Sequence, residues 1–283
     1  MVREFALINE KGRTFSLMNI ENYVLLTDPA GLGYRYNTQY EQVGTAFLEN
    51  VRRIEQGQIV GIVNTTKYEN FKKLIDFIEG SESIRFLYRV PYQTGAKEYY
   101  KDVKINELTK TQKNTNGIIS ETITFDCLGL WYSEDETVYD VTSGGDEMRW
   151  DYRWDARYTE YDVRSLAYNN QGHIPAPILV EIDGEVSNPK IEIIRDGETV
   201  ASIEIPITIG IYEKLLYSSK TGEIFIKKQL ADGTETSLFK KQYIDITKNN
   251  IFKLPLGVSE VKLSADDEIN SAKLTIYPQY KAV

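Results

Sequence analysis

The chain has little of the side-chain chemistry on which most enzymes and metal sites depend. Its 283 residues include one histidine, one cysteine and three methionines. One imidazole and one thiol cannot build a zinc site of the usual kinds, and a single cysteine excludes an internal disulfide. The sequence also lacks a P-loop, a complete dinucleotide-binding fingerprint and a G-x-S-x-G elbow. We therefore expect no metal, no cofactor and no catalytic residue.

Long apolar runs and excess positive charge are also missing. No stretch reaches the length that a bilayer span needs, and the opening MVREFALINEKG has no apolar signal-peptide region. These features predict a protein made in the cytoplasm that does not enter a membrane. Lys and Arg number 33 against 42 Asp and Glu, which gives a net charge of −9. A nucleic-acid reader needs a basic footprint, so this class is disfavoured.

Tyrosine, in contrast, is abundant. The chain carries 20 tyrosines, and 41% of its residues are hydrophobic, which is enough for packed cores. Tyrosine is favoured at protein interfaces because its ring is apolar and its hydroxyl is polar, but it also suits β-strands. Composition alone leaves both interpretations open.

The N-terminal half reads as β-structure with one helix. The helix is predicted over residues 67–79, where Thr66 and Glu69 form a T-x-x-E capping box and Gly80 follows the last turn. Its apolar stripe is Tyr68, Phe71, Leu74, Ile75 and Ile78. A turn is predicted over residues 27–33. Strands are predicted over residues 4–8, 14–18, 23–26, 46–52, 58–64, 83–90, 101–108 and 118–128. In the last of these, Cys127 shares a face with Ile123 and Phe125, which predicts a buried, inert thiol.

Proline and glycine divide the C-terminal half into short strands. Pro175 and Pro177 hold the chain extended before a strand over residues 178–182, and further strands are predicted over 190–195 and 258–263. Asp-Gly or Thr-Gly turns begin at Asp196, Thr221 and Asp232. This spacing is typical of a sandwich or a barrel.

The local composition changes near residue 132. The segment SEDETVYDVTSGGDEM is acidic and contains glycine, which suits a connection between domains, although a long hairpin fits equally well. We predict two domains, over residues 1–133 and 134–283.

One row of aromatic side chains suggests a binding surface. Trp150, Tyr152 and Trp154 alternate with charged residues, so they share one face of a predicted strand. Such a row can be a platform for sugar rings, but aromatic side chains on one face more commonly belong to a core. The single histidine, His173, precedes two prolines and is expected to lie in a loop or on an edge strand and not to act as a base.

Three segments, taken in order, carry a resemblance to a known family. They are YVLLTDPAGLGYRYNTQYEQVG through FLENVRRIEQGQIVGIVNTTKYENFKKLIDFIEG, then IPAPILVEIDGEVSNPKIEI, then IFKLPLGVSEVKL followed by SAKLTIYPQY. As an ordered set they resemble the distal tail proteins of siphophage-type tails, which are also found in prophages and tail-like particles.

The resemblance implies a mainly β protein. Its N-terminal part would be a β-barrel-like ring domain with a helix, and its C-terminal part a galectin-like β-sandwich. It further implies a structural protein that forms a homo-hexameric ring at the virion tail tip after assembly in the bacterial cytoplasm. Its expected partners are the tail-tube protein, the tail-associated lysin or tip protein and receptor-binding proteins. DNA would pass through the ring without specific binding.

A galectin-like fold does not by itself imply sugar binding, because function resides in sites and not in folds. The His, Asn, Arg and Trp set by which galectins hold galactosides is not present around His173. The alternative function is a carbohydrate-binding β-sandwich protein, associated with a glycosidase activity, that engages host cell-wall polysaccharide.

Overall fold

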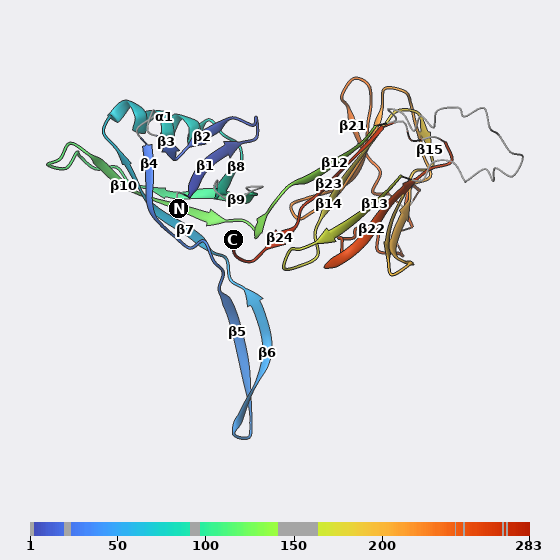
Figure 1. Ribbon diagram of the computed structural model, residues 1–283, viewed down its shortest axis with the longest axis horizontal. Coiled ribbons are helices and arrows are strands. Elements are labelled where there is room, and N and C mark those ends of the chain that lie inside the picture. The colour runs from blue at the N-terminus through green and yellow to red at the C-terminus, as the bar shows by residue number, and fades with distance from the viewer. Residues whose placement is uncertain are drawn as a thin grey trace, which may run out of the picture. The chain divides into compact units, whose positions relative to one another are not determined.

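The computed structural model describes residues 3–19, 24–90, 97–140, 164–240, 242–245, 247–267, 269 and 271–283. They form two compact units. The first comprises Met1–Ser133 together with Gln279–Val283, and the second comprises Glu134–Pro278. The predicted fold class is confirmed, since strands dominate both units and the described residues contain one α-helix (Figure 1). No helix in this described part is long and apolar enough to span a membrane.

In its described residues, the first unit contains twelve strands and the helix α1, Tyr68–Glu79. The strands are β1 Glu4–Asn9, β2 Thr14–Ser16, β3 Met18–Asn19, β4 Val24–Ala30, β5 Tyr36–Val43, β6 Ala46–Ile54, β7 Gln58–Thr65, β8 Ile84–Arg89, β9 Glu98–Leu108, β10 Ile119–Cys127, β11 Trp131–Tyr132 and β24 Gln279–Tyr280.

The main sheet of this unit closes on itself. Its order is β2-β1-β8-β9-β10-β7-β4-β3, and β11 pairs with both β9 and β24. Its two end strands are joined by one residue, Leu17. The Leu17 amide donates to the Phe5 carbonyl at 2.9 Å, and the Leu17 carbonyl accepts from the Leu26 amide at 2.7 Å. Closure of this kind leaves few unpaired edges and gives the barrel-like form that the resemblance implied.

Alternation along the strands builds the core of this unit. Ile123, Phe125 and Cys127 all face inward and are buried, as the sequence predicted. The helix adds Phe71, Leu74 and Ile78, each of which stabilises the unit by about 1.5–3 kcal/mol relative to an exposed side chain. Tyr68, predicted to belong to the same stripe, is instead half exposed.

The start of the helix differs from the prediction. The N-cap is Lys67, and no side chain makes a cap hydrogen bond, so the predicted Thr66–Glu69 capping box is wrong. Helical geometry begins one residue later than that motif requires, because Thr65 is held at the end of β7 and its hydroxyl accepts from the Lys67 amide at 3.4 Å. The helix ends at Gly80, as predicted.

The part of the second unit that the structure describes contains twelve strands. They are β12 Asp135–Asp140, β13 Arg164–Asn170, β14 Ile178–Asp183, β15 Val186–Ser187, β16 Lys190–Arg195, β17 Glu198–Glu204, β18 Thr208–Ile209, β19 Lys214–Lys220, β20 Glu223–Gln229, β21 Glu235–Ser237, β22 Gly257–Ser264 and β23 Ser271–Ile276.

Two antiparallel sheets enclose the core of the second unit. One has the order β12-β23-β14-β19-β20-β21 and the other β13-β22-β16-β17. Val180 from the first sheet and Ile193 and Val261 from the second belong to one buried apolar cluster. The alternating burial of β14 and β22 places one side of each strand in this core. The unit is therefore a sandwich.

Turn chemistry in this unit follows the sequence closely. Gly197, Gly222 and Gly233 all have positive φ, so the three predicted turns are confirmed. Part of the segment that was predicted to be a connection is instead strand β12, which pairs with β23. Thr27 to Ala30, predicted as a turn, lie within β4.

Candidate functional site: an exposed hairpin arm

Strands β5 and β6 form a two-stranded sheet of their own, which we call the arm. The arm is an extension of the β4–β7 hairpin and projects away from the main sheet of the first unit (Figure 1). Its register runs from Tyr36 opposite Ile54 to Val43 opposite Ala46. An isolated two-stranded ribbon is marginally stable in water, so the arm needs support at its base or a partner along its length.

Aromatic and charged side chains fix the base of the arm. The Arg52 guanidinium lies 3.8 Å from the centre of the Tyr36 ring, and the Lys281 ammonium donates to the Tyr36 hydroxyl at 2.8 Å. On the approach to the arm, the Trp131 indole N–H donates to the Leu32 carbonyl at 2.8 Å. The arm therefore leaves the first unit in a defined direction.

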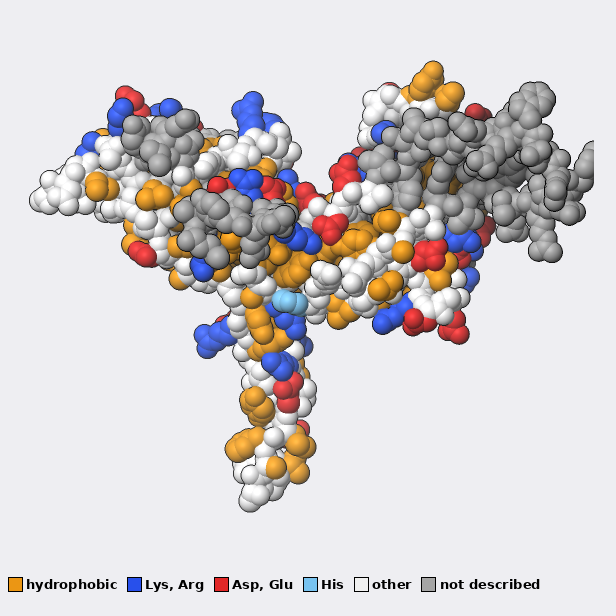
Figure 2. Space-filling view, in the orientation of Figure 1, with side chains coloured by type: hydrophobic (Ala, Val, Ile, Leu, Met, Phe, Trp, Pro, Cys, Tyr) orange, Lys and Arg blue, Asp and Glu red, His pale blue; other side chains and the backbone are white. Residues whose placement is uncertain are grey.

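The distal half of the arm exposes apolar side chains on both of its faces. Cross-strand partners share a face, so Tyr40 and Phe47 lie on one face, and Val43 and Leu48 lie on the other. Phe47 is 67% exposed, Tyr40 62% and Leu48 57%. Hydrophobic side chains are visible along the arm and around its tip in Figure 2. Monomeric proteins rarely present such a group to water, so the arm has the character of an interaction element.

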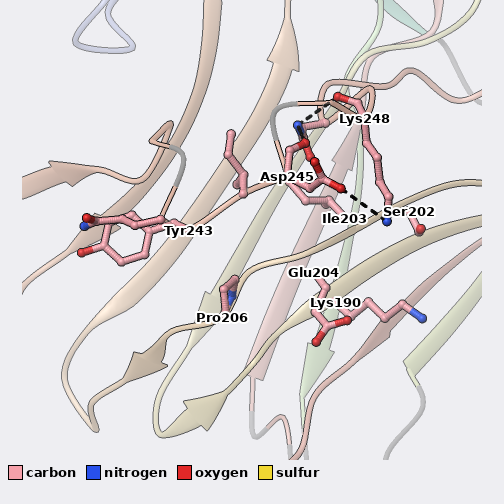
Figure 3. A pocket seen from close by; sticks show the side chains of 11 residues that line it. Lys190, Ser202, Ile203, Glu204, Pro206, Tyr243, Asp245 and Lys248 are labelled. Atoms are coloured by element: carbon pink, nitrogen blue, oxygen red, sulfur yellow. Dashed lines mark hydrogen bonds and ion pairs between the residues drawn. The ribbon is translucent and has the colours of Figure 1, made fainter.

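A second surface lies at the edge of the second unit. It is a cleft of about 440 Å³ between strand β17 and the segment from Gln242 to Asn250 (Figure 3). Ser202, Ile203 and Glu204 form one wall, and Tyr243 and Asp245 belong to the other. We call this surface the edge cleft.

Three of the four charged side chains that line the edge cleft form ion pairs within the chain. The Lys190 ammonium pairs with Glu192 at 2.8 Å, and Lys248 pairs with Asp245 at 3.8 Å. The hydroxyl and amide of Thr247 donate to the Asp245 carboxylate and lower its pKa.

Two reactive side chains of the first unit, Cys127 and Lys101, are buried. Burial raises the pKa of the Cys127 thiol and lowers the pKa of the Lys101 ammonium, which is 4% exposed. The Lys101 ammonium also lies 5.0 Å from the Trp131 ring centre. A buried thiol whose pKa is raised is a poor nucleophile, which agrees with the predicted structural role.

The predicted candidate residues have separate outcomes. His173 is exposed in a bend that precedes the prolines, as expected. Trp150, Tyr152 and Trp154 lie outside the described residues, so the carbohydrate platform stays a prediction. Among the residues that are described, no group of three or more His, Cys, Asp or Glu side chains is placed to hold a metal ion.

The arm was not recognised from the sequence. Strand β6 was predicted in part, but β5, with the sequence YNTQYEQV, was not. A useful signal was present: the run YNTQYEQV, with two tyrosines, and the run AFLENVRRI, with Phe47, Leu48, Val51 and Ile54, flank the tight turn at Gly44.

The chain consists of a closed β-sheet with a solvent-exposed arm and of a β-sandwich. The exposed apolar arm is typical of β-proteins that bind other proteins. The family model described as "Distal tail protein, N-terminal domain" matches residues 4–128. The distal tail protein of Lactococcus phage SK1 is 29% identical over 151 residues, and that of Lactococcus phage p2 is 28% identical over the same length. Each alignment spans 51% of this chain and 50% of the relative, which is about half the length of each protein. Residues 4–128 of the chain therefore match the N-terminal domain of distal tail proteins, and about half of the chain is similar to distal tail proteins of two Lactococcus phages.

Solved structures extend the likeness of fold to the whole chain. A chain in the structure of the phage P2 baseplate in its activated conformation with calcium matches with a TM-score of 0.67 at 19% identity, over 100% of both chains. The Dit protein of phage SPP1, whose structure is described as a paradigm of the hub adsorption apparatus in phages infecting Gram-positive hosts, matches with a TM-score of 0.55 at 10% identity. That match covers 96% of this chain and 98% of the SPP1 protein. At these identities the likeness shows a shared fold.

Proposed function

We propose that this chain is a non-enzymatic structural protein of a phage tail tip. Copies of it close into a hexameric ring that joins the tail tube to the tip or lysin protein and lets DNA pass. The observation that carries this proposal is the arm, because it exposes apolar side chains on opposite faces and lies within the residues that match the distal tail protein N-terminal domain.

The arm explains how a single chain could close a ring. Both apolar faces of the arm are removed from water only when the arm inserts between surfaces of another molecule. Lying on a single surface would bury one face and leave the other exposed. A head-to-tail contact, in which each copy gives an arm and receives one, is heterologous and closes when the rotation per copy divides a full turn. Burial of Phe47, Leu48 and Tyr40 would contribute about 1.5–3 kcal/mol for each side chain.

The net charge fits passage of DNA through such a ring. Each copy carries −9, and a negative wall repels the phosphate backbone. The second unit then serves as the scaffold on which further tail-tip proteins, including receptor-binding proteins, dock. The tail tip of the virion is the proposed location, with assembly in the host cytoplasm.

Native mass spectrometry of the purified chain tests the arm directly. The wild-type chain is expected as a six-copy species. In the Phe47→Asp/Leu48→Asp variant, charged groups replace the apolar tip on both faces, and assembly should weaken by at least roughly a hundredfold. Circular dichroism should stay unchanged, because the arm does not contribute to the core of the unit.

Val258→Asp is the matched control. Val258 is 64% exposed but lies on β22 of the second unit, so this variant should assemble like the wild type. A double variant that assembles normally would refute the role of the arm. A wild-type chain that stays monomeric at every concentration would refute the ring.

A further inference from the structure

The edge cleft lies beside a strand whose outer side has no strand partner among the described residues. Strand β17 is the last member of its four-stranded sheet and pairs with β16 alone. Its sequence, ETVASIE, has acids at its two ends and no lysine or proline between them. Exposed strand edges are commonly protected from pairing with other chains by a lysine, a proline or a covering segment. Strand β17 contains no lysine and no proline.

The register of β16 and β17 shows which main-chain groups point into the cleft. The Ile205 amide donates to the Pro189 carbonyl at 3.0 Å, so this pair is a hydrogen-bonded one. Bonded and non-bonded pairs alternate in antiparallel strands, which makes Lys190–Glu204 and Glu192–Ser202 non-bonded pairs. The amides and carbonyls of Ser202 and Glu204 therefore point away from β16, toward the cleft.

The opposite wall of the cleft is held rigidly. The Asn250 side-chain amide donates to the Asp245 carbonyl at 2.7 Å and to the Lys248 carbonyl at 3.0 Å. Ile244 is buried in the core and anchors the segment from below. A fixed wall that faces an open strand edge makes a slot, so an incoming chain would not have to order this segment.

We propose that the edge cleft binds an extended segment of another polypeptide, which adds to β17 as a fifth strand. An extended strand offers amides and carbonyls at the two-residue spacing of Ser202 and Glu204, and main-chain hydrogen bonds would supply its affinity. The charges around the cleft are two lysines and two acids, three of which are already in ion pairs within the chain. Main-chain pairing is thus the dominant recognition chemistry.

A saccharide fits this slot less well. Sugar sites present an exposed aromatic face, whereas Tyr243, the aromatic residue of the cleft, is partly buried and packs against the sandwich core. Three consecutive residues of β17 line the slot, which means that backbone as well as side chains forms its wall.

Amide hydrogen exchange measured on the isolated chain and on purified tail particles tests this inference. The inference rests on the proposed function only because the tail particle is taken as the source of the partner segment. The Ser202 and Glu204 amides should exchange rapidly in the isolated chain and at least tenfold more slowly in the particle. Slow exchange of both amides in the isolated chain would contradict the inference, because the edge would already be covered. Equal exchange in both samples would also contradict it, whereas a chain absent from the particle would count against the proposed function.

Two variants separate main-chain pairing from side-chain contact. Ser202→Pro removes the amide that faces the cleft and is tolerated at an edge, while Ser202→Ala keeps that amide. When Ser202→Pro is mixed with the wild type during assembly, its affinity for the partner segment should be roughly tenfold lower. This loss is measured as faster hydrogen exchange of the Glu204 amide in the variant than in the wild type. Ser202→Ala should match the wild type.

Hydrogen exchange also tests whether a saccharide, and not a polypeptide, occupies the edge cleft. If host wall polysaccharide, added to the isolated chain, slows exchange at Ser202 and Glu204, and Ser202→Pro does not change this, the cleft is a saccharide site and the proposal is wrong.

Discussion

At the scale of single residues, Gly31 controls where the chain leaves the sheet for the arm. Its φ is +83°, and a methyl group on its Cα would lie 1.8 Å from the Gln58 carbonyl oxygen at the start of β7. A side chain here requires the two strands to separate. We predict that Gly31→Ala lowers the free energy of unfolding of the first unit by more than about 2 kcal/mol, as measured by urea denaturation.

Gly44, in the turn of the arm, provides the control for this prediction. Its φ is +63°, but a methyl group there would meet open space. Gly44→Ala should therefore cost only about 1 kcal/mol, from backbone strain alone. Equal losses in the two variants would show that the close approach to Gln58 does not matter.

Glu213 gives the second unit a dependence on pH. The Lys228 ammonium, at 2.5 Å, and the Gly210 amide, at 2.6 Å, lower the pKa of this carboxyl below its ordinary value of 4.5. A lowered folded-state pKa means that the stabilisation is complete at neutral pH and is lost as the pH falls through the folded value. We predict that the melting temperatures of wild type and Glu213→Gln differ at pH 7 and converge as the pH falls below the ordinary carboxyl pKa of 4.5 and through the lower folded-state value.

Lys228→Met removes the same ion pair from the other side. Its melting temperature should follow the pH profile of Glu213→Gln. If either variant keeps the wild-type pH profile, the pair does not stabilise the unit.

At the scale of elements, the helix begins with an unfavourable residue. Lys67 occupies the N-cap, where a positive charge opposes the helix dipole and no side chain accepts a hydrogen bond from the first turn. We predict that Lys67→Asn raises the free energy of unfolding by about 1 kcal/mol in urea denaturation. Lys73→Asn, in the middle of the exposed helix face, should lower it by a few tenths, because asparagine is a weaker helix former.

Elements with one buried face could be predicted from the sequence. Strand β14, ILVEID, alternates between buried and partly exposed residues, and its predicted start at Ile178 is correct, because one side of the strand meets the core. Strand β5 has no such contrast. Both faces of the arm are exposed, so no burial requirement shapes its pattern, and the sequence showed only the turn and the strand-forming residues.

Local motifs failed where tertiary structure decided the outcome. The Thr66–Glu69 motif satisfies the capping rule, but the end of β7 delays the helix by one residue. The edge cleft depends on a strand and on a segment some forty residues later in the chain, and no local pattern predicts that two such segments lie side by side.

At the scale of the whole molecule, the last residues of the chain belong to the first unit. Tyr280 pairs with Trp131, and its ring lies 5.3 Å from that of Tyr99. Lys281 holds Tyr36 at the base of the arm. The chain therefore runs from the first unit through the whole second unit and returns to the first unit with its last five residues. The stability of the first unit depends on these C-terminal residues.

Deletion of residues 279–283 tests this dependence. Calorimetry should show a lower transition temperature for the first unit, with a loss of about 2–4 kcal/mol for removal of a buried aromatic and its strand pairing, and an unchanged transition for the second unit. Deletion of Ala282 and Val283 alone should leave both transitions in place. A full deletion that lowers both transitions equally would contradict the assignment of these residues to the first unit.

Electron microscopy of the purified wild-type chain in negative stain tests the arm and the ring most directly. We predict closed rings of six copies around a hollow centre, and the loss of these rings in Phe47→Asp/Leu48→Asp. Single particles of one chain, or open filaments that never close, would contradict this prediction.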